Sequence, residues 1–284
     1  MKTYIECVPC IINQATHLSR DLTDDPKKQE SFLREVLKNL SEVSYNHSPP
    51  HIAAYVYRLI RQTLNNPDPY KKVKDEYNQK AKKLYPSLKK KVKSSRDRFK
   101  TAVKLAIAGN VIDFGSSQNF QLDKTIKQVL NKNLAIDDVT RLKKEIKKVS
   151  SILYLGDNAG ETFFDRILIE EFPRKEIYYG VRGTPVINDA TEEDARIAGL
   201  DKITQIISNG SDAPGTILDE CSREFKKIFN KADLIVAKGQ GNYETLNEVK
   251  DKNIFFLFMV KCPVIAHDAR CCVGDNVVWK LPLN

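Results

Sequence analysis

The spacing of apolar residues changes character near residue 150. Before that point apolar residues recur every three or four positions, as at Phe32, Val36 and Leu40, which is the period of an amphipathic helix. Beyond it, short apolar runs alternate with segments of helical period. The pattern therefore predicts helices in the first half, with a break at 48–50 and a helix end at Pro86. In the second half it predicts strands at residues 152–155, 177–181, 203–207, 234–237 and 254–260.

Strands that alternate with helices along a chain favour a mostly parallel sheet covered by helices on both faces. We therefore expect an α/β protein, with an N-terminal helical domain packed on a C-terminal three-layer α/β/α sandwich. The predicted domains are 1–148 and 149–284, and the helical domain is expected to end with helices at 122–130 and 136–149. No Gly- or Ser-rich linker separates the two halves, which indicates that they pack closely.

Polar and charged residues follow nearly every predicted strand. Because the carboxyl ends of parallel strands meet at one edge of a sheet, we expect these side chains to converge there. Carboxylates and amides suit a hard divalent cation, while Lys side chains and backbone N–H groups beside Gly suit phosphate oxygens. The sequence therefore predicts a metal-assisted phosphoryl site built from Asp157, Asn158, Arg182, Asn188, Asp189, Asn209, Ser211, Asp212, Lys238, Gly239, Asn242, Lys261 and Cys262.

Other interpretations of the first strand end compete with this one. Asp157 or Asn158 could simply cap the helix that follows. A haloacid-dehalogenase-type phosphatase would need a second Asp at position 159, which is Ala159, and no Gly-Lys-Ser/Thr of a P-loop occurs. The segment 155–161 also resembles the Gly-rich loop of a methyltransferase that uses S-adenosylmethionine. That alternative leaves Lys238 and Lys261 without a role.

Charge and hydropathy narrow the classes of partner. The net charge is +9, and residues 1–148 carry 30 Lys and Arg against 16 Asp and Glu, while residues 149–284 carry 16 against 21. The basic half lacks the interleaved aromatic residues of a single-strand groove, so the pattern argues against nucleic acid and favours a solvated helix surface. No apolar stretch approaches the roughly 18 residues of a membrane span, and no signal peptide is evident. We expect a cytoplasmic protein without a membrane partner.

The six cysteines are too few for a disulfide scaffold in 284 residues. Cys7 and Cys10 form a CxxC motif, which supplies at most half of a zinc site. They could join another cysteine in a structural metal site or a disulfide, or they could stay reduced. The sequence leaves these alternatives open.

Several motifs in order along the chain resemble those of the damage-control phosphatases, also known as domain of unknown function 89 or the acidic-residue-methyltransferase-like metal-binding domain. They are Gly-Asp-Asn-Ala-Gly-Glu at 156–161, Arg-Gly-Thr-Pro-Val-Ile-Asn-Asp-Ala-Thr at 182–191, Asp-Leu-Ile-Val-Ala-Lys-Gly-Gln-Gly-Asn-Tyr-Glu at 233–244 and Lys-Cys-Pro at 261–263. The segments 6–10 and 105–114 resemble the stand-alone microbial branch of that family.

The resemblance implies a helical N-terminal part, a C-terminal α/β/α sandwich and a divalent metal held by Asp157, Asn158 and Asp189. It also implies that Lys238 lies at the phosphate, and that the substrates are small phosphorylated metabolites such as sugar phosphates or damaged intermediates. It does not define the substrate of this branch.

The leading hypothesis is therefore a phosphatase that depends on Mn²⁺, Mg²⁺, Co²⁺ or Ni²⁺ and uses a water activated by the metal. The proposed catalytic residues are Asp157, Asp189 and Lys238. The substrate-binding candidates are Asn110, Asp113, Gly239 and Asn242. The sequence does not define the metal or the oligomeric state.

Overall fold

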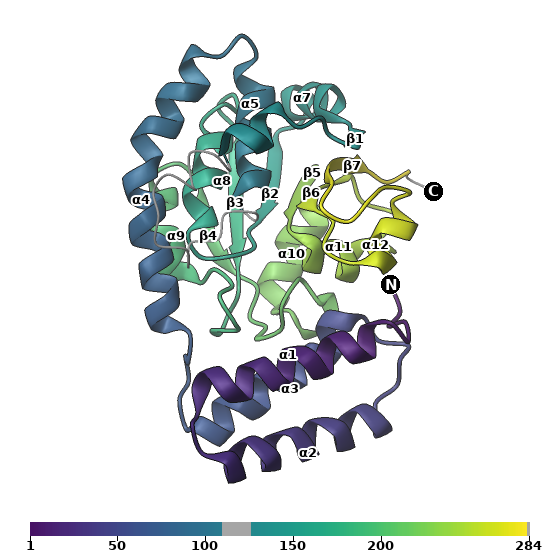
Figure 1. The fold of residues 1–284 in the computed structure, drawn as a ribbon. Helices are drawn as coiled ribbons and strands as arrows, with labels where there is room; N and C mark the ends of the chain where they lie inside the picture. Colours follow the sequence, from purple (N-terminus) through teal and green to yellow (C-terminus); the bar gives the residue numbers. More distant parts are fainter. Residues whose placement is uncertain (110–125, 283–284) are drawn as a thin grey trace.

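The computed structural model describes residues 1–109 and 126–282, and it begins with a bundle of three helices. These are α1 (Cys7–Leu22), α2 (Pro26–Glu42) and α3 (Pro49–Leu64). The Asp25 carboxylate accepts the Lys27 N–H at 3.0 Å and so caps α2, whose first residue is a proline. The bundle has its own apolar core and lies at one end of the molecule, below the sheet in Figure 1.

Two further helices, α4 (Lys71–Ser94) and α5 (Arg98–Ala108), lead from the bundle to the sheet. The prediction that a helix ends at Pro86 was wrong, because α4 continues through it. Proline removes one backbone hydrogen bond, but Leu88 and Val92 beyond it are buried in the same core as Ala81. Packing on both sides of Pro86 thus keeps the helix continuous.

The described residues form a sheet of seven strands in the order β1-β7-β6-β5-β2-β3-β4. Neighbouring strands are parallel except β6 and β7, which are antiparallel. From β2 the chain runs outward to β3 and β4, then returns to the other side of β2 with β5. The gap between the ends of β2 and β5 is therefore a topological switch point, where open α/β sheets bind ligands. The strands are β1 (Ile136–Asp137), β2 (Ser151–Leu155), β3 (Glu176–Val181), β4 (Gln205–Ser208), β5 (Leu234–Lys238), β6 (Ile254–Met259) and β7 (Asn276–Lys280).

The five predicted strands are all present, but β1 and β7 were not predicted. Residues 136–137 were expected to begin a helix, whereas they pair with β7, and helix α7 (Val139–Lys148) begins after them. Both strands lie toward one end of the sheet, where β7 pairs with β6 and β1 pairs with β7, and a local pattern does not reveal such tertiary pairing. Of the helix expected at 122–130, residues 126–130 are helical and the rest lies outside the described residues.

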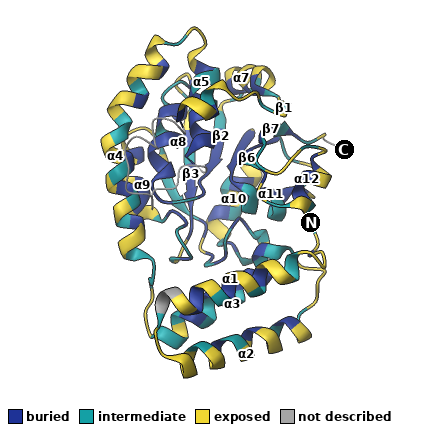
Figure 2. Cartoon of the chain, viewed as in Figure 1, coloured by how far each residue is buried: buried dark blue, intermediate teal, exposed yellow. Residues whose placement is uncertain are grey.

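Helices cover both faces of the sheet, which confirms the expected α/β class. Ile152 and Tyr154 of β2 pack with α4, α5, α7 and α8, while Leu153 and Leu155 pack with α10, α11 and α12. The strands are dark with burial in Figure 2, whereas the outer faces of α2 and α4 are exposed. The remaining helices are α8 (Glu161–Ile169), α9 (Glu192–Ile197), α10 (Arg223–Lys231), α11 (Gln240–Leu246) and α12 (Pro263–Asp268), with short 3₁₀ turns at Leu200–Lys202 and Leu218–Glu220.

The first half of the chain makes two different contributions. Helices α1–α3 form the bundle, while α4, α5 and α7 share one continuous apolar core with the sheet. The division at residue 148 stays a prediction. Across both described ranges, no helix combines the length and the apolar character that crossing a bilayer requires.

Candidate active site

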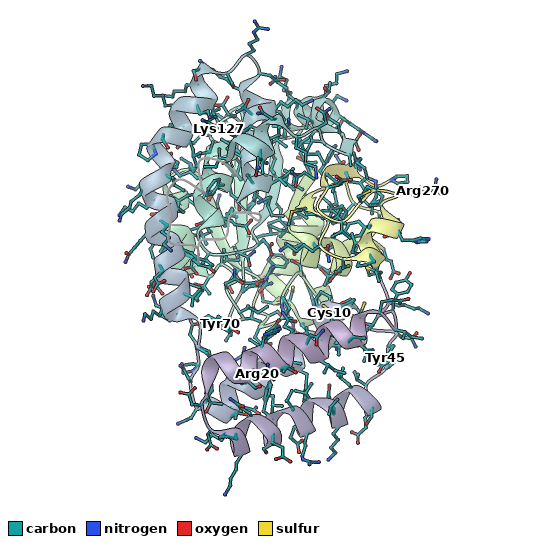
Figure 3. The ribbon with its side chains drawn as sticks, viewed as in Figure 1. Cys10, Arg20, Tyr45, Tyr70, Lys127 and Arg270 are labelled. Atoms are coloured by element: carbon teal, nitrogen blue, oxygen red, sulfur yellow. The ribbon has the colours of Figure 1, made fainter. Side chains whose placement is uncertain are left out.

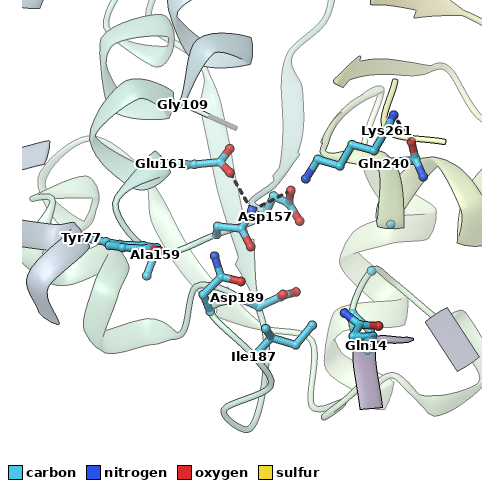
Figure 4. Close-up of a pocket in the computed structure, with 15 residues that line it drawn as sticks. Gln14, Tyr77, Gly109, Asp157, Ala159, Glu161, Ile187, Asp189, Gln240 and Lys261 are labelled. Atoms are coloured by element: carbon cyan, nitrogen blue, oxygen red, sulfur yellow. Dashed lines mark hydrogen bonds between the residues drawn. The ribbon is translucent and has the colours of Figure 1, made fainter. Parts of the chain in front are cut away.

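A cavity of about 370 Å³ lies at the carboxyl ends of the strands, at the switch point. The loops after β2, β3, β4, β5 and β6 line it, together with Gln14 of α1 and Tyr77 of α4. Figure 4 shows these side chains directed into one space. The polar residues that line it are Gln14, Tyr77, Asp157, Asn158, Glu161, Asn188, Asp189, Gln240 and Lys261.

Backbone hydrogen bonds tie the loop after β2 to the loop after β3. Asn158 and Asp189 form an isolated antiparallel bridge. On either side of it, the Ala159 N–H donates to the Asn188 carbonyl and the Ala190 N–H donates to the Asp157 carbonyl, both at 2.8 Å. The bridge explains how Asn158 and Asp189, 31 positions apart in the sequence, come to share one wall of the cavity.

The side chain of Asn158 is oriented by two carboxylates. Its Nδ2 donates to Asp157 Oδ2 at 3.1 Å and to Glu161 Oε1 at 2.7 Å. The amide oxygen is therefore the atom that a cation in the cavity would meet. Two carboxylates and an amide oxygen on one wall form the hard donor set that Mg²⁺ and Mn²⁺ prefer.

Asp157 also depends on a glycine across the switch point. Gly239 has a φ of +80°, and a Cβ atom there would lie 2.0 Å from Asp157 Oδ2. Any other residue would displace the carboxylate from the start of α11. Gly239 therefore acts by making room for Asp157 and does not itself line the cavity, whereas Gly241, two residues later, does.

Asp189 is paired with a buried arginine. Arg182 Nε donates to Asp189 Oδ2 at 2.6 Å, and both side chains are at most 5% exposed. Burial raises the pKa of Asp189 to about 6, and the charge of Asp157 adds to that rise, while Arg182 opposes it. Burial therefore leaves the charged carboxylate poorly stabilised despite its arginine, and a divalent ion bound beside it would stabilise it.

Lys238 lies beneath the wall of the cavity and does not line it. Its fully buried Nζ is 2.9 Å from Asp165 Oδ1 and 3.3 Å from Glu161 Oε2. Asp165 also accepts the hydroxyls of Tyr154 and Tyr179, both at 2.7 Å. Burial lowers the pKa of Lys238, but Asp165 and Glu161 raise it more, so the amine stays charged.

Glu161 joins this buried network to the cavity. Burial raises its pKa to about 7, and Lys238 holds the value down. It contacts Asn158 on one side and Lys238 on the other. Glu161 was predicted only as part of the motif at 156–161; the structure shows that, as the first residue of α8, it reaches back to Asn158 in the loop before the helix.

The cation that does line the cavity is Lys261, which follows β6. Its side chain extends toward Asp157 in Figure 4. Its backbone N–H donates to Gln240 Oε1 at 2.8 Å, which fixes the loop against α11. The charge of Lys261 also acts on Asp189 and lowers its pKa.

Other predicted residues lie elsewhere. Asn242 is buried and does not line the cavity; its Nδ2 donates to the carbonyls of Lys238 at 2.7 Å and Gly156 at 3.2 Å, so it joins the loops after β2 and β5. Asn110 and Asp113 lie outside the described residues. Asp212 is bound by Arg58 and Arg61 of α3.

The cysteines of the CxxC motif are at the start of α1, and all six cysteines of the chain are free thiols. Figure 3 shows Cys10 on the side of α1 that faces the α/β half. Among the residues described, no three His, Cys, Asp or Glu side chains form a group that could hold a metal ion by themselves. The predicted set of Asp157, Asn158 and Asp189 differs in that an amide is its third member.

The glycines after β2 serve packing within the protein. A Cβ at Gly156 would lie 2.6 Å from the Tyr179 hydroxyl, and one at Gly160, whose φ is +78°, would lie 3.2 Å from the backbone of Tyr77. These glycines therefore accommodate neighbouring protein groups. This use does not favour the methyltransferase alternative, in which they would face a cofactor.

Ile187 is a residue that sequence reasoning could not single out. It lines the cavity with a φ of +45°, a conformation that β-branched residues rarely adopt. It lies two residues before Asp189 and packs against the core of the bundle. Such strain persists only where the surroundings enforce it, and it is commonly found in functional loops.

Comparison with known proteins agrees with this geometry. Residues 3–277 match the family model described as damage-control phosphatase ARMT1-like domain. A protein named damage-control phosphatase from Pyrococcus horikoshii is 39% identical over 285 residues, covering 99% of this chain and 98% of that protein. One from Archaeoglobus fulgidus is 38% identical over 288 residues, covering 98% of each. A crystal structure of a DUF89 family protein from Pyrococcus horikoshii superposes with a TM-score of 0.93 at 38% identity, over 99% of both chains.

Proposed function

The chain belongs to the damage-control phosphatase ARMT1-like family and is a phosphatase, and we propose that it hydrolyses small phosphorylated metabolites with the help of a divalent metal ion. The observation that carries this proposal is the bridge between Asn158 and Asp189. It brings two carboxylates and an amide onto one wall of a cavity that also contains a lysine.

Asp157, Asn158 and Asp189 would hold the ion, and Mn²⁺, Mg²⁺, Co²⁺ and Ni²⁺ are the candidates. When bound, such an ion polarises a phosphate oxygen and acidifies water. The chain's own contribution is orientation. Glu161 holds the amide of Asn158, Arg182 holds Asp189, and Gly239 leaves space for the Asp157 carboxylate.

We assign different roles to the two lysines, Lys238 and Lys261. The sequence-based hypothesis places Lys238 at the phosphate, but its burial against Asp165 and Glu161 favours a positioning role. Lys261 lines the cavity and extends toward Asp157, so it is the better candidate to neutralise the non-bridging phosphate oxygens. Sugar phosphates and damaged phospho-metabolites are the substrate classes that the sequence-based hypothesis names, and both belong in the panel of substrates to be tested.

The test is release of phosphate from p-nitrophenyl phosphate and from a panel of phosphorylated metabolites, after chelation and after addition of each metal. We expect activity only with metal, and its loss in Asp157→Ala and Asp189→Ala. Asp201→Ala is the matched control, because Asp201 is exposed on a short turn and lines no part of the cavity. Wild-type metal-dependent rates in Asp157→Ala and Asp189→Ala would refute the assignment.

A further inference from the structure

A second cavity, of about 320 Å³, adjoins the first. We call it the annex. It lies between helices α1 and α3 of the bundle on one side and the loops after β5 and β6 on the other. The two cavities share six lining residues, Gln14, Ile187, Pro214, Gln240, Gly241 and Lys261. The two cavities therefore lie side by side, and a ligand anchored in the first is within reach of the annex.

The two cavities differ in chemistry. Carboxylates and amides line the first, whereas the annex is lined largely by apolar side chains, among them Ile11, Ala53, Tyr57, Pro263 and Val264. Residues from both halves of the chain thus meet around an apolar space beside a charged one.

The thiols of the annex add to its apolar character. Cys7, Cys10 and Cys262 all line it. Burial raises the pKa of Cys7 and of Cys10 above the usual thiol value, so both remain neutral at physiological pH. A neutral thiol behaves as a small, polarisable apolar group.

The main polar side chain at the junction of the cavities is already engaged. Gln240 Nε2 donates to Glu244 Oε1 at 2.7 Å, and its Oε1 accepts the Lys261 N–H at 2.8 Å. The annex is also lined by Glu6, Gln14, Glu244 and Lys261. Apolar side chains still make up most of its lining, so a sugar hydroxyl that entered it would find fewer hydrogen-bond partners than in water, which is unfavourable.

We propose that the annex binds the alcohol part of the phosphate ester, and that this part is a predominantly apolar chain, with the phosphate in the first cavity. The proposal rests on the phosphatase function proposed above. At ~30 Å³ for each water-sized group, the annex has room for about ten such groups. The preferred substrates are therefore phosphate monoesters of medium-length aliphatic, thioether or aromatic alcohols, and sugar phosphates are poorer ligands.

The test uses methyl-, butyl- and hexylphosphonate, which the enzyme cannot hydrolyse, titrated by calorimetry into the full chain with saturating Mn²⁺. Each methylene that enters the annex is expected to tighten binding about fourfold until the space is full. In parallel, kcat/KM for hexyl phosphate is expected to exceed that for glucose 6-phosphate at least tenfold. Affinity that changes less than twofold from methyl- to hexylphosphonate would overturn the proposal.

Two substitutions fill the annex from opposite walls. Cys10→Phe acts from α1 and Val264→Phe from α12, and neither residue lines the first cavity. Each is expected to reduce the gain in affinity from methyl- to hexylphosphonate at least tenfold. Because Cys10 is exposed, Cys10→Phe is expected to fold normally. A reduced gain in affinity in this variant would therefore reflect filling of the annex. Cys272→Phe places the same side chain at an exposed cysteine that lines neither cavity, and it should keep the wild-type gain.

The outcomes separate the two proposals. If methylphosphonate binds and metal-dependent hydrolysis occurs, but chain length has no effect, the phosphatase assignment stands and the annex proposal is wrong. If no phosphonate binds and no ester is hydrolysed with any metal, both are wrong. An unchanged gain in both annex variants would also contradict the annex proposal.

Discussion

Asp189 and Asp212 lie in neighbouring loops at the same edge of the sheet, and each is bonded to arginine, yet their electrostatic states are opposite. Asp189 has one arginine, is almost fully buried beside Asp157, and has its pKa raised to about 6 by burial. Asp212 is about 23% exposed and is bonded to Arg58 and Arg61, which outweigh its burial and lower its pKa.

The comparison shows what distinguishes a ligand site from a structural ion pair when both begin as an Asp after a strand. At Asp212 the fold supplies enough positive charge, and the carboxylate fastens α3 to the loop after β4. At Asp189 burial has the largest influence, and the single arginine does not offset it, so the charged carboxylate is poorly stabilised. A cation that enters from solvent would stabilise it.

The largest expected effect comes from matched substitutions of these two residues. Asp189→Asn should lower metal-dependent kcat/KM roughly 10²–10³-fold, because an amide replaces a charged ligand. Asp212→Asn should leave kcat/KM within about threefold but lower the free energy of unfolding by about 1–3 kcal/mol, because Arg61 loses its counter-charge and Arg58 keeps only Glu220. Steady-state kinetics and urea unfolding of both variants test this. Equal losses of activity in Asp189→Asn and Asp212→Asn would contradict the distinction between a ligand site and a structural ion pair.

Two lysines offer the same contrast among cations. Lys238→Met should destabilise the protein by about 3 kcal/mol, since it leaves the buried Glu161 and Asp165 without their counter-charge. Lys261→Met should lower kcat/KM about tenfold and change stability by less than about 0.5 kcal/mol, because this residue is exposed. If Lys261→Met unfolds the protein while Lys238→Met only slows catalysis, the roles are reversed.

The smallest expected effect is a pH dependence at Glu244. Burial raises the pKa of this carboxyl to about 7, from an ordinary value near 4.5. The native state therefore holds the proton more tightly than the unfolded state, and stability falls as pH rises from about 4.5 through 7. Because the side chain is partly exposed, the loss should be only about 1–2 kcal/mol.

Urea unfolding with chelator at pH 4.5 and pH 8 measures that loss. The side chain at position 244 cannot ionise in Glu244→Gln, so the variant should not show this loss between pH 4.5 and pH 8. Its unfolding free energy relative to that of wild type should therefore be higher at pH 8 than at pH 4.5. A difference that is the same at both pH values would show that Glu244 keeps an ordinary pKa.

Much of the fold follows from local pattern, and the exceptions have physical causes. The strand before Asp157 is a short apolar run that ends at a glycine, and such runs identified the five strands from β2 to β6. Strand β1 was not predicted because its partner β7 is 141 residues away, and β7 was not predicted because its pairing with β1 and β6 leaves no clear local pattern. The prediction that a helix ends at Pro86 was wrong because packing of α4 on both sides of the proline outweighs the loss of one backbone hydrogen bond.

The site could be predicted only as a set of residue types at strand ends. The directions of the two lysines required the fold. Lys238 is the last residue of β5 and has the parity of Leu234 and Val236, which face α8, so its amine meets Glu161 and Asp165. The sequence does not reveal which helix covers that face. Nor does it reveal that Lys261, beyond the end of β6, turns toward the cavity.

The central claim is that Asp157, Asn158 and Asp189 hold a divalent ion, and its most direct test is calorimetric titration of Mn²⁺ into the chelator-treated protein. We expect wild type and Asp212→Asn to bind the ion with the same affinity, and Asp189→Asn to bind it at least tenfold more weakly. Equal affinity in wild type and Asp189→Asn, or a loss confined to Asp212→Asn, would contradict the account.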